Sequence, residues 1–221
     1  MTTQDQESAV DAGAGPDCVA EADSGAARDA GSGRPRTFTE QARREQLLDA
    51  TIGQVAQRGY AGASLARIAE AAGITKAAVL YHVGSKDALI AAAYQRVLDA
   101  LVASVGAAID AAPVSERPAV YIRAMVAHLR DHPQHVRVLA EVGREQVVDY
   151  APEARWAPLA GLIDAAAEAA TGENGAATVD SRALALIIGG AIDGIVAERL
   201  ADEDFDVTAA ADLLVSLLPG D

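Results

Sequence analysis

The sequence predicts an all-α fold, with a three-helix helix-turn-helix head followed by a larger helical domain. Apolar residues make up 51% of the 221 residues, but aromatic residues only 4%, and alanine is frequent throughout. The apolar positions recur at helical spacing and β-branched runs are few, which favours helices over strands. We expect three parts: a tail (residues 1–36), the head (residues 37–84) and a helical body (residues 85–221).

The net charge of −14 is unevenly distributed along the chain. Residues 1–33 carry a charge of −6, residues 34–96 a charge of +4, and residues 97–221 a charge of −12. An acidic protein repels DNA in general, whereas a basic segment attracts phosphate and orients the approach. The charge pattern therefore limits any nucleic-acid contact to the segment that contains the head.

The tail is rich in Ala, Gly, Asp and Ser and has no apolar periodicity, which predicts disorder. It ends with Arg34 and Arg36, which form either a basic arm toward DNA or a solvated linker. The single cysteine, Cys18, cannot form an intrachain disulfide. No secretory signal is visible, and the longest apolar run, 183–192, is too short to cross a bilayer. We expect a soluble, cytoplasmic protein without a membrane partner.

The first helix of the head is predicted to begin with Thr39 as its N-cap and to end in the glycine-rich turn at residues 59–62. Two short helices should follow, capped by Ser64 and Thr75 and separated by a turn at Gly73. This pattern is a helix-turn-helix, whose second helix is shaped to enter a major groove. The predicted inward-facing positions are Leu47, Leu48, Thr51, Ile52, Val55, Leu65, Ile68, Ala69, Ala72, Val79 and Val83.

Four runs of the head, in this order and spacing, resemble the DNA-binding head of the tetracycline-repressor (TetR) family. They are Arg-Arg-Glu-Gln-Leu-Leu-Asp-Ala at 43–50, Arg-Gly-Tyr at 58–60, Ser-Leu-Ala-Arg-Ile-Ala-Glu-Ala-Ala-Gly at 64–73 and Val-Leu-Tyr-His-Val-Gly-Ser-Lys-Asp-Ala-Leu at 79–89. The resemblance covers about residues 39–98 and implies a homodimeric, ligand-responsive regulator of transcription. It places the DNA contacts on Ser64, Thr75, Lys76, Ala77, Ala78, Tyr81, His82 and Lys86.

The chemistry of these side chains suits DNA. Lys76 can donate to guanine O6 and N7 or to phosphate, and the small Ala77 and Ala78 allow close approach to the groove. Tyr81 and His82 can donate to phosphates; the alternative is a surface tyrosine and a histidine favoured by the helix C-terminus. The chain departs from the family pattern at three positions. Leu80 stands where the family usually has tyrosine, Val83 where it often has phenylalanine, and Ala77 where it usually has glycine or proline.

Prolines divide the body into helices. A fourth helix should begin after the cap Ser85 and run toward Pro113, with Ser115 as cap of the next helix. Further helices are expected before Pro133, after it, and after Pro152. Candidate effector-binding residues are the large or polar side chains of this region, with core packing as the alternative role; the acidic charge favours a cationic ligand. These candidates are Tyr121, Met125, His128, Tyr150 and Trp156.

The last two predicted helices, 182–200 and 207–218, are apolar around much of their circumference. Gly189, Gly190 and Gly194 provide small surfaces against which another helix can pack closely. We expect them to pair with a second copy as a four-helix bundle, the interface that the resemblance also implies. The alternative is that they form the interior of a monomer.

The sequence indicates no enzyme and no cofactor, because it contains no glycine-rich nucleotide loop and no nucleophile–base pair. His128 and His132 share a helical face, but Pro133 is expected to keep His135 away from them. We therefore expect satisfied or exposed histidines rather than a metal site.

The hypothesis from sequence is a dimeric repressor that binds a near-palindromic operator in double-stranded DNA and is released by an unidentified small molecule. The alternative is a helical small-molecule-binding protein with a vestigial DNA-binding head.

Overall fold

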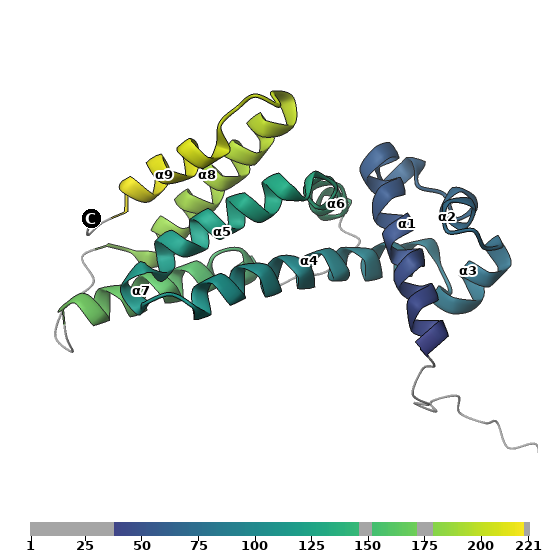
Figure 1. Ribbon diagram of the computed structural model, residues 1–221, viewed down its shortest axis with the longest axis horizontal. Coiled ribbons are helices and arrows are strands. Elements are labelled where there is room, and N and C mark those ends of the chain that lie inside the picture. Colours follow the sequence, from purple (N-terminus) through teal and green to yellow (C-terminus); the bar gives the residue numbers. More distant parts are fainter. Residues whose placement is uncertain (1–37, 146–151, 172–178, 219–221) are drawn as a thin grey trace, which may run out of the picture. The chain divides into compact units, whose positions relative to one another are not determined.

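The computed structural model describes residues 38–145, 152–171 and 179–218, and every regular element in these ranges is a helix. The predicted all-α class is therefore confirmed. In chain order the α-helices are α1 (Phe38–Gly62), α2 (Leu65–Ala71), α3 (Lys76–Val83), α4 (Lys86–Asp110), α5 (Arg117–Asp131), α6 (Pro133–Arg144), α7 (Ala157–Thr171), α8 (Ser181–Ala201) and α9 (Val207–Ser216) (Figure 1). Short 3₁₀ turns, Val114–Glu116 and Pro152–Arg155, precede α5 and α7.

The helix-turn-helix forms as the sequence predicts. The Ser64 hydroxyl accepts from the Arg67 amide at 3.4 Å, and the Thr75 hydroxyl accepts from the Ala78 amide at 3.1 Å. Gly73 adopts a φ of 66°, a conformation that side chains with a Cβ rarely take. α1 begins at Phe38, so Thr39 lies within the helix and the predicted cap there is wrong.

The core of the head extends beyond the three helices that the sequence assigned to it. Val138 and Val142 of α6 are fully buried in the same apolar cluster as the head residues. α4 adds its first turns to this cluster, including Leu89 and Ile90. Three helices of this length bury little apolar surface, and the contribution from α4 and α6 completes the core. The other buried members are Leu47, Leu48, Ile52, Val55, Ala63, Ile68, Ala69, Ala72, Val79, Ala93 and Val97.

A break in α1 is held by two side chains of α6. Gly59 has φ 68° and ψ 175°, which is outside the helical region, so the helix is interrupted there. In a continuous helix the Tyr60 amide would donate to the Ala56 carbonyl. Here the Tyr60 amide donates to Glu141 Oε2 at 3.2 Å, and Arg137 Nη1 donates to the Ala56 carbonyl at 3.5 Å. One turn of α6 therefore satisfies both halves of the interrupted backbone bond.

α4 links the head to the body. By length and composition it could cross a membrane, with a mean hydropathy of 1.4 over its most apolar window. In the fold, however, it packs against α1, α3, α5 and α6, and Arg96 pairs with Asp49 of α1 at 3.0 Å. This packing buries one set of apolar side chains of α4, namely Leu89, Ile90, Ala93, Val97, Leu101 and Val105, whereas Val102 is exposed.

A second apolar core holds the body together. It is built from α5, α7, α8 and α9, with Ile122, Leu159 and Ile188 among its fully buried side chains. Ser115 lies in the 3₁₀ turn and α5 starts at Arg117 after Glu116, so the predicted cap at Ser115 is wrong. α8 and α9 pack against each other close to the predicted bounds (Figure 1).

Replacement of Gly59 by alanine should destabilise the protein by about 1–3 kcal/mol, because the φ and ψ of Gly59 belong to a region that only glycine adopts readily. In addition, the new Cβ would lie 2.8 Å from Glu141 Oε2. Chemical denaturation of the full chain measures the change.

Gly53→Ala is the matched control for this substitution. Gly53 lies within α1, and a Cβ built there meets no atom within 4 Å. It should be neutral or stabilising by up to about 1 kcal/mol. Equal loss of stability in both variants would contradict the special role of Gly59.

Candidate DNA-binding site

One exposed face of α3 is formed by Lys76, Ala77, Leu80 and Tyr81, which recur at helical spacing. The opposite side is anchored by Val79, which is fully buried in the head core. Tyr81 is the most prominent of the four, with 87% of its surface exposed. The helix thus presents an ammonium group, a methyl group and a phenol to the solvent on a single surface.

Other residues of the predicted contact set lie next to this face. Thr75 is exposed and caps α3, while Ala78 is half-buried. The exposed His82 lies edge-on to the ring of Tyr81, with the ring centroids 5.4 Å apart. Leu80, where the family usually has tyrosine, is 40% exposed and adds an apolar group instead of a hydroxyl.

Lys86 has a structural role that the sequence did not reveal. Its ammonium donates to the Tyr60 carbonyl at 2.6 Å and lies 4.3 Å from the centroid of the Tyr60 ring. The Tyr60 hydroxyl donates to Asp87 at 2.5 Å, and this hydrogen bond is the main cause of the raised pKa of Tyr60. Lys86 therefore lies at the start of α4 and fixes the end of α1. The amides of the first turn of α4 lie beside it, and such amides suit a phosphate.

Arg67 is a further exposed cation of the head, and the contacts predicted from the sequence did not include it. It lies in the first turn of α2, exposed, three residues after the cap Ser64. Its guanidinium donates to the Gly62 carbonyl at 3.0 Å, which holds the side chain beside the start of the helix. The signal in the sequence is a basic residue one turn after a predicted contact. Arg34 and Arg36, the predicted basic arm, lie outside the described residues.

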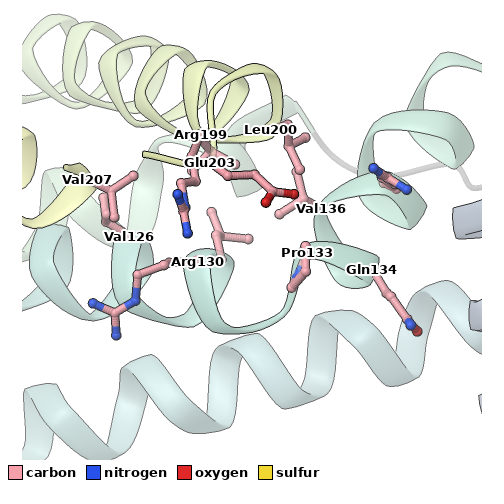
Figure 2. Close-up of a pocket in the computed structure, with 12 residues that line it drawn as sticks. Val126, Arg130, Pro133, Gln134, Val136, Arg199, Leu200, Glu203 and Val207 are labelled. Atoms are coloured by element: carbon pink, nitrogen blue, oxygen red, sulfur yellow. The ribbon is translucent and has the colours of Figure 1, made fainter. Parts of the chain in front are cut away.

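Four of the five predicted effector-binding residues lie in the described part of the chain, beside the second core or where α5 meets α6. Tyr121, Met125 and Trp156 are partly buried against the second core, and burial raises the pKa of Tyr121. His128 is buried, and Tyr150 lies outside the described residues. A cavity of about 470 Å³ lies instead between α5, α6, α8 and the start of α9, and none of these candidates lines it (Figure 2).

Three histidines cluster where α5 meets α6. The prediction that Pro133 keeps His135 away is wrong, because α6 starts at Pro133 and turns His135 back toward α5. His128 Nε2 and His135 Nδ1 are 3.3 Å apart, and the His132 ring stacks on His135 with centroids 4.7 Å apart. Among the residues that the structure describes, no group of three or more His, Cys, Asp or Glu has the geometry of a metal site.

Part of the chain around the head is similar to known proteins. Residues 47–93 match the family model described as "Bacterial regulatory proteins, tetR family". The HTH-type transcriptional regulator BetI of Burkholderia thailandensis is 36% identical over 93 residues. That stretch covers 42% of this chain and 47% of BetI, so the chain spans about half the length of this curated relative.

Solved structures resemble a larger part of the chain. A TetR-like transcriptional regulator from Rhodococcus sp. RHA1 has a TM-score of 0.63 at 27% identity, over 79% of this chain and 92% of that one. The structure of AibR, solved with isovaleryl coenzyme A and operator DNA, has a TM-score of 0.63 at 20% identity, over 80% and 97% of the two chains. The second likeness is one of fold alone.

The histidine cluster predicts a loss of stability in mild acid. Burial, followed by the neighbouring His132, lowers the pKa of His128, and burial and the same neighbour lower the pKa of His135. Near pH 6.5 these histidines therefore bind protons in the unfolded chain but remain largely unprotonated in the folded chain. Their contribution to stability is complete above that pH and is lost as the pH falls through the lowered pKa values of the folded state.

The double variant His128→Gln, His135→Gln tests this expectation. Between pH 7.5 and pH 5.5 the parent should lose on the order of 1 kcal/mol more of its unfolding free energy than the variant does. Thermal or urea unfolding at each pH measures the difference. A difference between parent and variant that stays constant with pH would contradict the assignment.

Proposed function

We propose that the chain is a dimeric, sequence-specific transcriptional repressor that a small molecule releases from its operator. The match of residues 47–93 to the family model described as "Bacterial regulatory proteins, tetR family" supports this proposal. The observation that carries the proposal is the exposed face of α3, with Lys76 and Tyr81 on one surface of an otherwise acidic protein. Both lysines of the chain, Lys76 and Lys86, lie in or next to this head. The proposed activity is regulation of transcription in the cytoplasm rather than catalysis.

Each exposed group has a proposed task on DNA. Lys76 reads a guanine edge in the major groove, and the methyl groups of Ala77 and Ala78 contact the groove floor. Tyr81 and His82 donate to phosphates, which sets the register of the helix in the groove. Ser64, Thr75, Lys86 and the newly found Arg67 bind the backbone on either side, and Arg34 and Arg36 extend the contact as a basic arm.

The proposed dimer uses α8 and α9. Ile187 of α8, Leu213 of α9 and Leu217, which follows the last residue of α9, are 68%, 64% and 70% exposed, which is costly for apolar side chains of a monomer. Cβ atoms built on Gly189, Gly190 and Gly194 meet no atom within 4 Å, so these positions leave space for a partner helix. Two copies would bury these surfaces as a four-helix bundle and place two heads about 34 Å apart, one turn of DNA.

Release by a ligand requires that the ligand prefers the conformation of the protein that fits DNA poorly. AibR, which shares the fold, was solved with both an acyl coenzyme A and operator DNA, and this supports a ligand-responsive body. Tyr121, Met125, His128 and Trp156 remain candidates for a ligand that enters the second core. The cavity beside α6 is the alternative place.

Selection from a random DNA library with the full chain tests the proposed function. Enriched fragments should share a near-palindrome and bind more tightly than unrelated DNA at several salt concentrations. A vestigial head would give no enriched sequence, and such a result would overturn the proposal.

Lys76→Ala should weaken binding to the selected site by about 1–3 kcal/mol and relax the preference at one base pair. Removal of the only ammonium group on the exposed face of α3 is the physical reason. Fluorescence anisotropy with matched and altered sites measures it. Arg155→Gln, which removes an exposed charge from the body, is the control and should leave the preference unchanged. If the preference for that base pair is unchanged in Lys76→Ala, Lys76 contacts a phosphate and does not read a base.

Ile187→Asp combined with Leu213→Asp should shift the protein from dimer to monomer, because burial of two carboxylates in an apolar interface is unfavourable. Sedimentation at micromolar concentration measures the mass. Val102→Asp is the control, since Val102 is an equally exposed apolar residue on α4, at 62%. A monomeric parent, or a dimer that survives both substitutions, would contradict the proposed interface.

A further inference from the structure

The cavity beside α6 has the size of a small-molecule site. Its volume of about 470 Å³ lies within the range usual for ligand pockets. It is lined by the end of α5, the first turns of α6, the end of α8 and the segment that leads into α9 (Figure 2). Apolar side chains form much of the wall: Val126, Leu129, Val136, Val196, Leu200 and Val207.

The charged side chains of the cavity are three arginines and one glutamate: Arg130, Arg137, Arg199 and Glu203. The net charge of these four side chains is positive, opposite in sign to the charge of the body, which is −12 over residues 97–221. Positive side chains collected around a cavity of an acidic domain favour an anion inside it. The local charge, rather than the charge of the whole body, decides which ligand the cavity accepts.

The arginines differ in how well their charge is compensated. Arg130 forms two hydrogen bonds with the carboxylate of Asp131, at 2.7 and 3.1 Å. Within the residues that the structure describes, the Arg137 guanidinium donates only to a neutral group, the Ala56 carbonyl. In the described part of the chain, no hydrogen bond or ion pair joins the side chain of Arg199 to another residue, and its guanidinium extends into the space between α8 and α5 (Figure 2). Arg199 is therefore the group best placed to bind an incoming anion.

We propose that this cavity binds an organic anion, a carboxylate with a compact apolar body, and that Arg199 holds its charged group. The apolar body lies against the valines and leucines of the wall, since burial there removes apolar surface from water. The charged group gains a charge-assisted hydrogen bond from a guanidinium that has no hydrogen-bond or ion-pair partner among the described residues. This inference rests on the proposed function, because it gives the small-molecule effector a site and a chemical class.

Arg137 connects the cavity to the head. The same side chain lines the cavity and donates to the Ala56 carbonyl of α1 at 3.5 Å, the upper limit for a hydrogen bond. A carboxylate in the cavity is a stronger acceptor than a backbone carbonyl. A ligand that draws Arg137 away leaves the Ala56 carbonyl unsatisfied and loosens α1 at its break. Ligand and DNA then oppose each other, because each prefers a different position of Arg137.

Isothermal titration calorimetry of the full chain tests the site, with octanoate, 1-octanol and octylammonium as probes that share one alkyl chain. Octanoate should bind, and the neutral and cationic probes should bind at least ~10-fold more weakly. Arg199→Gln should weaken the binding of octanoate by about the same factor. Arg182→Gln, which removes a charge from the other end of α8, where Arg182 lies over Trp156, should not change it. The proposed site would be contradicted if octanoate did not bind, if the three probes bound equally, or if Arg199→Gln bound octanoate as tightly as the parent.

The coupling is tested by DNA affinity with and without octanoate. In the parent, octanoate should weaken binding to the selected DNA, and in Arg137→Gln this effect should disappear, while Arg137→Lys should restore part of it. Equal release in parent and Arg137→Gln would overturn the role of Arg137. Octanoate binding by a chain that selects no DNA would support the site and contradict the proposed function; DNA selection without octanoate binding would do the reverse.

Discussion

The structure depends on one interrupted backbone hydrogen bond. Gly59 separates the Tyr60 amide from the Ala56 carbonyl, and α6 supplies a partner to each through Glu141 and Arg137. Unsatisfied polar groups at a helix end are costly, so this pair of contacts ties the head to the body more specifically than apolar packing alone. The turn that ends α1 also positions Tyr60, whose carbonyl accepts from Lys86 at the start of α4.

The position of α6 gives the body a means to act on the head. α6 contributes Val138 and Val142 to the head core, lines the cavity with its first turns, and carries the histidine that meets α5. A change at any of these places acts on the same short helix. Because packed cores shift between discrete arrangements rather than deform continuously, a ligand at one end of α6 can alter the support of α1 at the other.

Electrostatics separates the functions along the chain. The acidic body repels DNA, the lysines of the head attract it, and the arginines of the cavity form a local positive site within the acidic part. The exposed apolar residues lie elsewhere, with Ile187 and Leu213 on the last two helices. DNA, ligand and a second copy of the chain are thus proposed to use different surfaces, which allows one to influence another without direct competition.

The sequence by itself determined what depends on local chemistry: the helical class, the caps Ser64 and Thr75, the turn at Gly73 and the basic segment around Lys76. Each follows from residues a few positions apart, so periodicity, capping and the family motif suffice. Only the tertiary structure decided which distant residues meet. The α6 contacts with α1 join residues 81 apart in the chain, the histidines meet across Pro133, and the cavity takes its arginines from separate helices. Packing between helices sets these contacts, and a single sequence carries no local signal for them.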